Sequence, residues 1–172
     1  MGAKPVVPDI KGIDGSNVKN VSEVDRGEVK TGEKVVVCGA GMSGTECALE
    51  LAMEGKKVTL VDLVPEDQFY NDSTQFAKPT IARLLAENNV KLTPECTVEE
   101  FASDGVTVKN AAGKKVKLPC DTAVIAFGVK PDKDAIAGLC EVVPETYIIG
   151  DSEKVGMIGD AISSAFWLTR NI

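Results

Sequence analysis

The sequence predicts an α/β protein, in which a parallel sheet has helices on one side and an antiparallel β-meander on the other. An apolar, β-branched run at 33–38 passes through a glycine-rich turn into a helical stretch and then into a second strand at 57–61. This is the order of a β-α-β unit. Three strand-like pieces between residues 96 and 118 are joined by glycine-containing pairs, which are typical of hairpins and predict the meander.

The first part of the chain is expected to change from a connecting segment to a domain near residue 31. Residues 1–30 hold several prolines and glycines with little hydrophobic periodicity, so they are expected to be a linker. The helix after the glycine turn is predicted from apolar residues at helical spacing, and Gly55 is expected to end it. Those apolar residues are Cys47, Ala48, Leu51 and Ala52.

The next elements follow from local signals. A polar loop is expected at 66–73, and Pro79 suits the first turn of a helix that ends near Asn88-Asn89. A short strand at 90–92 follows, and the continuous apolar run at 122–127 is typical of a buried parallel strand. The remaining expected elements are meander strands at 96–102, 106–110 and 114–118, a further strand at 147–149 and a helix at 158–172.

The glycine-rich turn is a dinucleotide-binding fingerprint. Gly39 permits the tight turn, Gly41 lets the backbone approach a pyrophosphate, and Gly44 lets helix and strand pack closely. The helix then offers its N-terminal amides to phosphates. Asp62 follows Gly44 by eighteen positions, which suits the acid that binds a ribose 2′-hydroxyl. A structural turn that holds no ligand is the alternative.

Asp62 also favours one cofactor. A carboxylate repels a 2′-phosphate, and acceptance of that phosphate usually needs a nearby arginine, whereas Glu66 and Asp67 add two acids here. We therefore expect NADH in preference to NADPH.

Composition excludes several function classes. The net charge of −7 argues against a surface for nucleic acid or an anionic membrane. Histidine is absent, which makes hydrolytic triads and zinc sites improbable. The five cysteines form no C-x-x-C pair, and no apolar run approaches 18 residues, so a cytoplasmic protein is expected. No residue is assigned a catalytic or metal-binding role.

A second nucleotide site is suggested near the C-terminus. The expected strand at 147–149 ends in Gly150-Asp151, and a helix follows. A strand, a Gly-Asp turn and a helix N-terminus can bind phosphate or ribose. A plain turn explains the same residues.

Several motifs together resemble the C-terminal pyridine-nucleotide and flavin region of NADH:flavin oxidoreductases, the relatives of enoate reductase, 2,4-dienoyl-CoA reductase and trimethylamine dehydrogenase. The resemblance covers nearly the whole chain. The residues that carry it are Gly2-Ala3-Lys4-Pro5, Pro8 and Gly12, the Gly39–Gly44 loop with Glu46, Ala126–Pro131, and Ile149-Gly150-Asp151 with Ala161-Ile162.

The resemblance implies a sequence of electron carriers. In such enzymes NADH reduces FAD, electrons cross a 4Fe-4S cluster, and FMN in an N-terminal barrel reduces an activated C=C bond. It implies a Rossmann-like NAD(H)-binding domain at 31–130, with remnants of an FAD-binding domain at 1–30 and 131–172.

The resemblance also implies roles for individual residues. The glycines with the Met42 and Ser43 amides would hold the NADH pyrophosphate, and Asp62 the adenosine ribose. Glu46, taken to lie in the first turn of the helix, would lie toward the nicotinamide, or would be a favourable charge at a helix N-terminus. Gly128 would close the cofactor cleft. Gly150 and Asp151 would bind the FAD ribityl–phosphate region.

Departures from the family pattern predict a fragment. No earlier GxGxxG is present, so the segment that would hold the FAD pyrophosphate is missing, as are the barrel, the FMN site and the cluster cysteines. We expect the isolated chain to bind NADH weakly, to bind FAD poorly and to be inactive. A nucleotide-binding regulatory or docking module without turnover, or a small FAD-dependent reductase of another type, are the alternatives.

Overall fold

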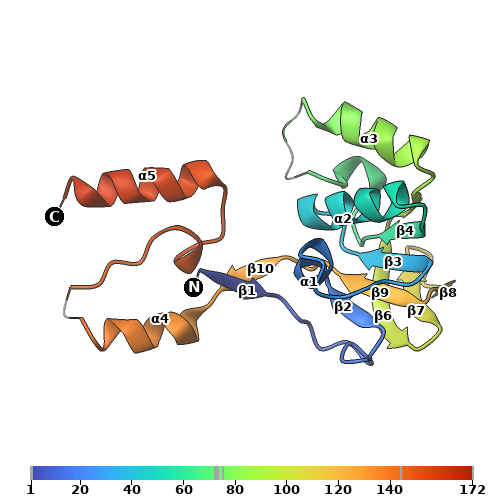
Figure 1. The fold of residues 1–172 in the computed structure, drawn as a ribbon, viewed down its shortest axis with the longest axis horizontal. Coiled ribbons are helices and arrows are strands. Elements are labelled where there is room, and N and C mark those ends of the chain that lie inside the picture. The colour runs from blue at the N-terminus through green and yellow to red at the C-terminus, as the bar shows by residue number, and fades with distance from the viewer. Residues whose placement is uncertain (1, 72–73, 75, 144, 172) are drawn as a thin grey trace. The chain divides into compact units, whose positions relative to one another are not determined.

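The computed structural model describes residues 2–71, 74, 76–143 and 145–171, and the chain divides into two compact units. Unit 1 is formed by Met1–Val6 together with Gly128–Ile172, and unit 2 by Val7–Phe127. Figure 1 labels the helices and strands of both units. Each unit is described by itself.

Unit 2 is built on a five-stranded sheet with the order β2-β9-β3-β4-β5, in which every pair of neighbours is parallel. Three of the strands, β3, β4 and β9, are buried on both faces, because their side chains alternate between two separate apolar clusters. In β3, Val35 and Val37 belong to one cluster, whereas Val36 and Cys38 belong to the other. The strands are β2 (Val18–Asn20), β9 (Thr122–Ile125), β3 (Lys34–Cys38), β4 (Lys57–Val61) and β5 (Lys91–Thr93).

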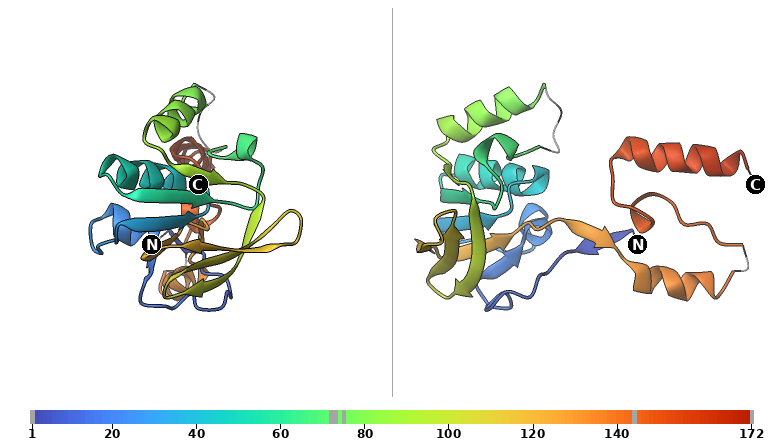
Figure 2. Two further views of the ribbon diagram at one scale, coloured as in Figure 1. Left: turned by 90° about the vertical axis from the view of Figure 1, so that its right-hand side faces the viewer. Right: turned by 180° about the vertical axis from the view of Figure 1, so that it is seen from behind.

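Helices cover one face of this sheet. The helix α2 (Met42–Met53) buries Cys47, Ala48, Leu51 and Ala52, the face predicted from their spacing. The helix α3 (Lys78–Glu87) has a proline in its first turn and is capped at Asn88, as predicted, and Leu85 anchors it in the same cluster. Figure 1 and Figure 2 show α2 and α3 on the same side of the sheet.

An antiparallel meander covers the other face. It consists of β6 (Cys96–Ala102), β7 (Gly105–Asn110) and β8 (Lys115–Pro119), and β6 contains a bulge between Val98 and Glu100. Inward residues of the meander pack against the second face of the sheet, among them Phe101, Val106, Val108 and Leu118. The predicted three-layer arrangement is therefore confirmed.

The first 31 residues contain more structure than a connecting segment. The short strand β2 extends the parallel sheet beside β9, and α1 (Val21–Asp25) follows with a capping box between Asn20 and Glu23. A three-residue strand shows no periodicity of its own, because its position depends on a partner about 100 residues away in sequence.

Unit 1 contains a two-stranded antiparallel ribbon, in which β1 (Ala3–Pro5) pairs with β10 (Val129–Pro131). Lys4 Nζ lies 2.9 Å from Asp132 Oδ1 and 2.8 Å from Asp134 Oδ2. These ion pairs connect β1 to the segment that follows β10. The other elements of the unit are α4 (Lys133–Cys140), the 3-10 helix η2 (Gly150–Ser152) and α5 (Ile158–Thr169).

The predicted strand at 147–149 is wrong. Tyr147, Ile148 and Ile149 form no strand, and their exposed fractions are 51%, 40% and 36%. An apolar β-branched run becomes a strand only where another strand offers hydrogen bonds. Within the part of the chain that the structure describes, none pairs with these residues.

Two predicted elements, the polar loop at 66–73 and the helix at 158–172, lie partly outside the described residues. The polar loop contains a short 3-10 helix, η1 (Glu66–Gln68), whereas Asp72 and Ser73 lie outside the described residues. The last helix ends at Thr169, and Ile172 also lies outside them. Among the described residues, no helix is both long and apolar enough to cross a membrane.

Candidate functional site

Glycine is required both in the turn between β3 and α2 and in the first turn of α2. Gly39 has φ +110°, and a Cβ there would lie 2.2 Å from the carbonyl oxygen of Ala126. A Cβ on Gly44 would lie 1.9 Å from the carbonyl oxygen of Gly39 and 2.9 Å from Ala126 Cβ. The helix therefore packs against the turn at backbone distance, as the fingerprint predicts.

The N-terminus of α2 has no side-chain cap from its own N-cap residue. Gly41 is extended, with φ −67° and ψ −176°, and has no side chain to donate or accept. Its carbonyl accepts the Thr45 N–H at 3.0 Å, while Met42 and Ser43 in the first turn are exposed. The first amides of a helix and the helix dipole favour an anion at its N-terminus.

Asp62 lies beside this turn. It directly follows β4, the neighbour of β3, and parallel strands end at the same edge of a sheet. One carboxylate oxygen accepts the Ala40 N–H at 2.6 Å, and the other accepts the N–H groups of Leu63 at 2.6 Å and Val64 at 3.3 Å. The half-buried acid is thus fixed against the glycine turn.

Sequence reasoning missed the role of Ala40 and Tyr70. The Ala40 carbonyl accepts the Tyr70 N–H at 2.7 Å and the Thr45 hydroxyl at 3.2 Å. Tyr70 has φ +47°, an unusual conformation for a bulky residue, and the neighbouring Phe69 is fully buried. The loop after β4 is thereby held on the glycine turn. No sequence signal marks Ala40, because these hydrogen bonds use its backbone atoms alone.

The position predicted for Glu46 needs a correction. The helix begins at Met42, so Glu46 is its fifth residue and lies in the second turn, and no acid occupies the first turn. The glycine turn keeps Gly41 extended and so delays the helix start. A favourable interaction with the helix dipole fades beyond the first turn, which removes that explanation for Glu46. The side chain is exposed.

The other predicted site residues belong to unit 1. Gly128 has φ +81° with open space where a Cβ would stand, and its carbonyl accepts the Val6 N–H at 2.9 Å. Gly150 has φ +59°, and Asp151 Oδ1 accepts the Gly156 N–H at 3.2 Å. The structure thus brings together the glycines, Met42, Ser43 and Asp62, and holds Gly128, Gly150 and Asp151 in a separate unit.

The cysteines are all free and four of them are buried. Burial raises the pKa of Cys120 to about 11, and it also raises the pKa values of Cys38 and Cys47. Cys140 is exposed. Thiols held in the neutral form are poor nucleophiles, so the buried ones are core residues. Within the described residues, no three metal-ligating side chains lie together.

Known proteins share this architecture over the full chain. Cinnamate reductase from Clostridium sporogenes is 30% identical over 99% of the chain, which covers 25% of that enzyme. A structure of 2-naphthoyl-CoA reductase with 2-naphthoyl-CoA superposes with a TM-score of 0.88 at 34% identity, over 99% of this chain and 26% of that one. The chain spans about a quarter of the length of these relatives.

Two oxidases are similar over a shorter part. The water-forming NADH oxidase from Lactobacillus brevis, bound to NADH, matches with a TM-score of 0.61 at 26% identity, over 80% of this chain and 31% of that one. An engineered NADPH oxidase derived from it, bound to NADPH, matches with a TM-score of 0.62 at 25% identity, over 86% and 34%. Its substitutions remove one aspartate and introduce two arginines.

The family follows from these matches. The resemblance to enoate and 2,4-dienoyl-CoA reductases is confirmed by relatives of that group, cinnamate reductase and 2-naphthoyl-CoA reductase. The family model for pyridine nucleotide-disulphide oxidoreductases matches residues 1–155. With its glycine turn, its acid after β4 and its three-layer unit, the chain belongs to the pyridine nucleotide-disulphide oxidoreductase family.

Proposed function

We propose that this chain is the NADH-binding part of a multidomain flavin-dependent oxidoreductase, in which it positions the nicotinamide for hydride transfer to FAD. One observation supports this most directly. The glycine turn, the N-terminus of α2 and the Asp62 carboxylate meet at the carboxyl edge of one parallel sheet. This is the edge at which open α/β sheets bind nucleotides.

The residues of unit 2 fit a dinucleotide. The Met42 and Ser43 amides, together with Gly39, Gly41 and Gly44, would receive the pyrophosphate. Asp62 would accept a ribose hydroxyl, exchanging its bond from the Ala40 N–H for one from the ligand. A bound nicotinamide supplies the hydride, and this chain supplies binding and orientation.

The charges beside Asp62 support NADH over NADPH. Glu66 and Asp67 form the 3-10 turn that follows within a few residues, and a 2′-phosphate placed there would meet negative charge. The engineered oxidase supports the same physical rule, since its move to NADPH is accompanied by loss of an aspartate and gain of arginines.

Unit 1 is proposed to be part of an FAD-binding domain. The domain bounds expected from the sequence are an NAD(H)-binding domain at 31–130 with flavin-domain segments at 1–30 and 131–172. Unit 1 takes up 1–6 and 128–172, whereas residues 7–30 pack within unit 2. Large apolar side chains of unit 1 are exposed, including Ile158 at 82%, Ile162 at 64% and Trp167 at 60%. Exposed apolar area of this kind usually marks a surface that another domain covers.

The remaining site residues are assigned to the nicotinamide, the cofactor cleft and the flavin. Glu46 would lie toward the nicotinamide, and Gly128 would close the cofactor cleft. Gly150 and Asp151 would contact the ribityl–phosphate region of FAD. In the longer enzyme we propose onward transfer through a 4Fe-4S cluster to FMN and reduction of an activated C=C bond, in a cytoplasmic setting.

The test is NADH binding to this chain by isothermal titration calorimetry, with the variant Gly41→Asp. A carboxylate at the helix N-cap would occupy the pyrophosphate position and repel it, so binding should be lost. Gly159→Asp is the matched control, because a Cβ at Gly159 meets open space in α5 and the charge change is the same. Unchanged NADH affinity in Gly41→Asp would contradict the proposal.

Turnover separates this proposal from a docking module. In the enzyme that contains the flavin domains, Gly41→Asp should abolish NADH-dependent reduction of an electron acceptor. If that activity survives while NADH binding to the chain is lost, the nucleotide site is regulatory and hydride enters elsewhere.

A further inference from the structure

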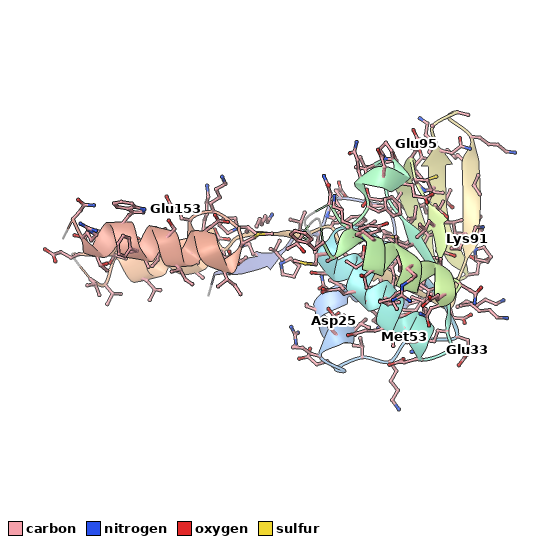
Figure 3. All side chains as sticks on the ribbon, turned by 90° about the horizontal axis from the view of Figure 1, so that it is seen from above. Asp25, Glu33, Met53, Lys91, Glu95 and Glu153 are labelled. Atoms are coloured by element: carbon pink, nitrogen blue, oxygen red, sulfur yellow. The ribbon has the colours of Figure 1, made fainter. Side chains whose placement is uncertain are left out.

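A cavity of about 540 Å³ lies at the opposite edge of the sheet from the glycine turn. It is lined by the first residues of β3, β4 and β5 and by the ends of α2 and α3. Figure 3 labels Met53, Glu33 and Lys91 on this side of unit 2, where α2 and α3 end. Its volume lies within the range of small-molecule sites.

The lining of this cavity is basic, although the whole chain has a net charge of −7. Four lysines line it, and Glu87 is the one acid among the lining residues. Glu87 pairs with Arg83 at 2.7 Å, and so it does not neutralise a lysine of the cavity. The lysines are Lys34, Lys56, Lys57 and Lys91.

Three of these lysines have no ion pair with any residue that the structure describes. Lys56 lies 3.1 Å from Glu54, but no carboxylate of the described residues lies within 4.0 Å of the ammonium groups of Lys34, Lys57 or Lys91. Lys34 and Lys57 are in register on neighbouring strands. Like charges placed side by side on a sheet are destabilising, so a counter-charge at this point would stabilise the fold.

Helix capping does not account for the lysines. Basic side chains often lie at helix C-termini because they bind the last carbonyls. Here the Leu51 carbonyl of α2 accepts the Lys56 N–H at 3.1 Å. In α3 the Leu85 carbonyl accepts the Val90 N–H at 2.9 Å, and the Leu84 carbonyl accepts the Asn88 side chain at 2.8 Å. These carbonyls thus accept hydrogen bonds from backbone N–H groups and a side-chain amide and, among the described residues, not from lysine ammonium groups.

We propose that this amino-edge cavity, as we call it, binds a small multivalent anion of the polyphosphate or phosphate-ester class. The three unpaired ammonium groups supply the charge, and the side chains of Thr59 and Asn89 on the same lining supply neutral donors. This site is separate from the cofactor turn, which lies at the carboxyl edge of the same sheet.

The probe is inorganic tripolyphosphate, titrated into the ¹⁵N-labelled chain and followed by amide NMR shifts. We expect saturable shifts at Lys34, Lys57, Asn88 and Asn89, and weaker binding as sodium chloride is raised. In the double variant K34Q/K57Q the affinity should fall about tenfold or more, because two charge-assisted contacts are lost. The matched control is K109Q/K114Q, which removes two exposed lysines from the β7–β8 hairpin.

Two further measurements keep this site distinct from the cofactor site. Gly41→Asp should retain the tripolyphosphate shifts at the amino-edge cavity, and K34Q/K57Q should retain the NADH affinity of the unmodified chain. Shifts confined to the Gly39–Gly44 turn, or equal affinity in K34Q/K57Q and K109Q/K114Q, would overturn the proposal. Lys91→Gln provides a second variant, should the double variant lose its dispersed spectrum.

Discussion

Gly44→Ala is the substitution for which the structure most clearly predicts the sign of the change in stability. In an open helix position, replacing glycine by alanine stabilises a protein by about 1 kcal/mol. At Gly44 the new methyl would lie 1.9 Å from the Gly39 carbonyl oxygen and 2.9 Å from Ala126 Cβ. Both distances are well below a carbon contact of about 3.5 Å, and neither atom is the end of a flexible side chain.

The magnitude follows from the shift that this clash requires. To accept the methyl, α2 must move away from the β3 turn, and overpacking of this kind costs about 1–3 kcal/mol, occasionally more. Because the closest atom is a backbone oxygen at 1.9 Å, the cost lies at the upper end of this range, about 3 kcal/mol, and the gain in helix preference of about 1 kcal/mol offsets only part of it. We expect the free energy of unfolding of unit 2 to fall by about 2 kcal/mol, which for a chain of this size lowers Tm by about 4–8 °C. NADH binding should weaken with it.

The assay is urea unfolding followed by amide NMR signals, so that each unit is observed through its own residues. Gly138→Ala is the control, because Gly138 lies within α4 and a Cβ there meets open space. It should stabilise its helix by about 0.5–1 kcal/mol. A Gly44→Ala variant as stable as the unmodified chain, or more stable, would refute the argument from close packing.

Three other outcomes are expected. Asp62→Asn should reduce the preference for NADH over NADPH in calorimetric titrations of both, because the charge that repels a 2′-phosphate is removed; an unchanged preference would exclude Asp62 as its source. Burial raises the pKa of Asp25 above its ordinary value of 3.8, so the folded state holds this proton more tightly than the unfolded state. That stability is present at low pH and is lost as pH rises through the raised pKa, and Asp25→Asn should flatten the dependence of the urea midpoint between pH 3 and 7, whereas an unaltered slope would assign it to other groups. Iodoacetamide should alkylate one thiol rapidly under native conditions, since Cys140 alone among the five cysteines is exposed, and mass spectrometry of Cys140→Ser should show that this fast reaction is lost; fast labelling of a second thiol would contradict the burial.

Most elements of unit 2 could be predicted from the sequence because their signals are local. The glycine turn, the apolar face of α2, Pro79 at the start of α3 and the hairpin glycines each constrain a few consecutive residues. Such constraints act through backbone angles and side-chain periodicity, which do not depend on distant partners. The alternation of β3 between two apolar clusters likewise follows from a continuous apolar run.

The errors lie where a distant partner decides the outcome. The run at 147–149 has strand-like composition, but no strand pairs with it in the described part of the chain. The short β2, in contrast, has no periodicity of its own and becomes a strand because it pairs with β9 in the parallel sheet. Glu46 lies in the second helical turn and not, as predicted, in the first, because an extended Gly41 sets where α2 begins.

By itself, the sequence determined the β-α-β unit, the glycine turn and the acid that accompanies it. Only the tertiary structure brought Asp62 and Tyr70 onto the backbone of Ala40, and only it gathered the lysines of three strands around the amino-edge cavity. The reason is physical. Turns and amphipathic faces arise from neighbouring residues, whereas a backbone hydrogen bond or a cluster of like charges between elements exists only once the chain has packed.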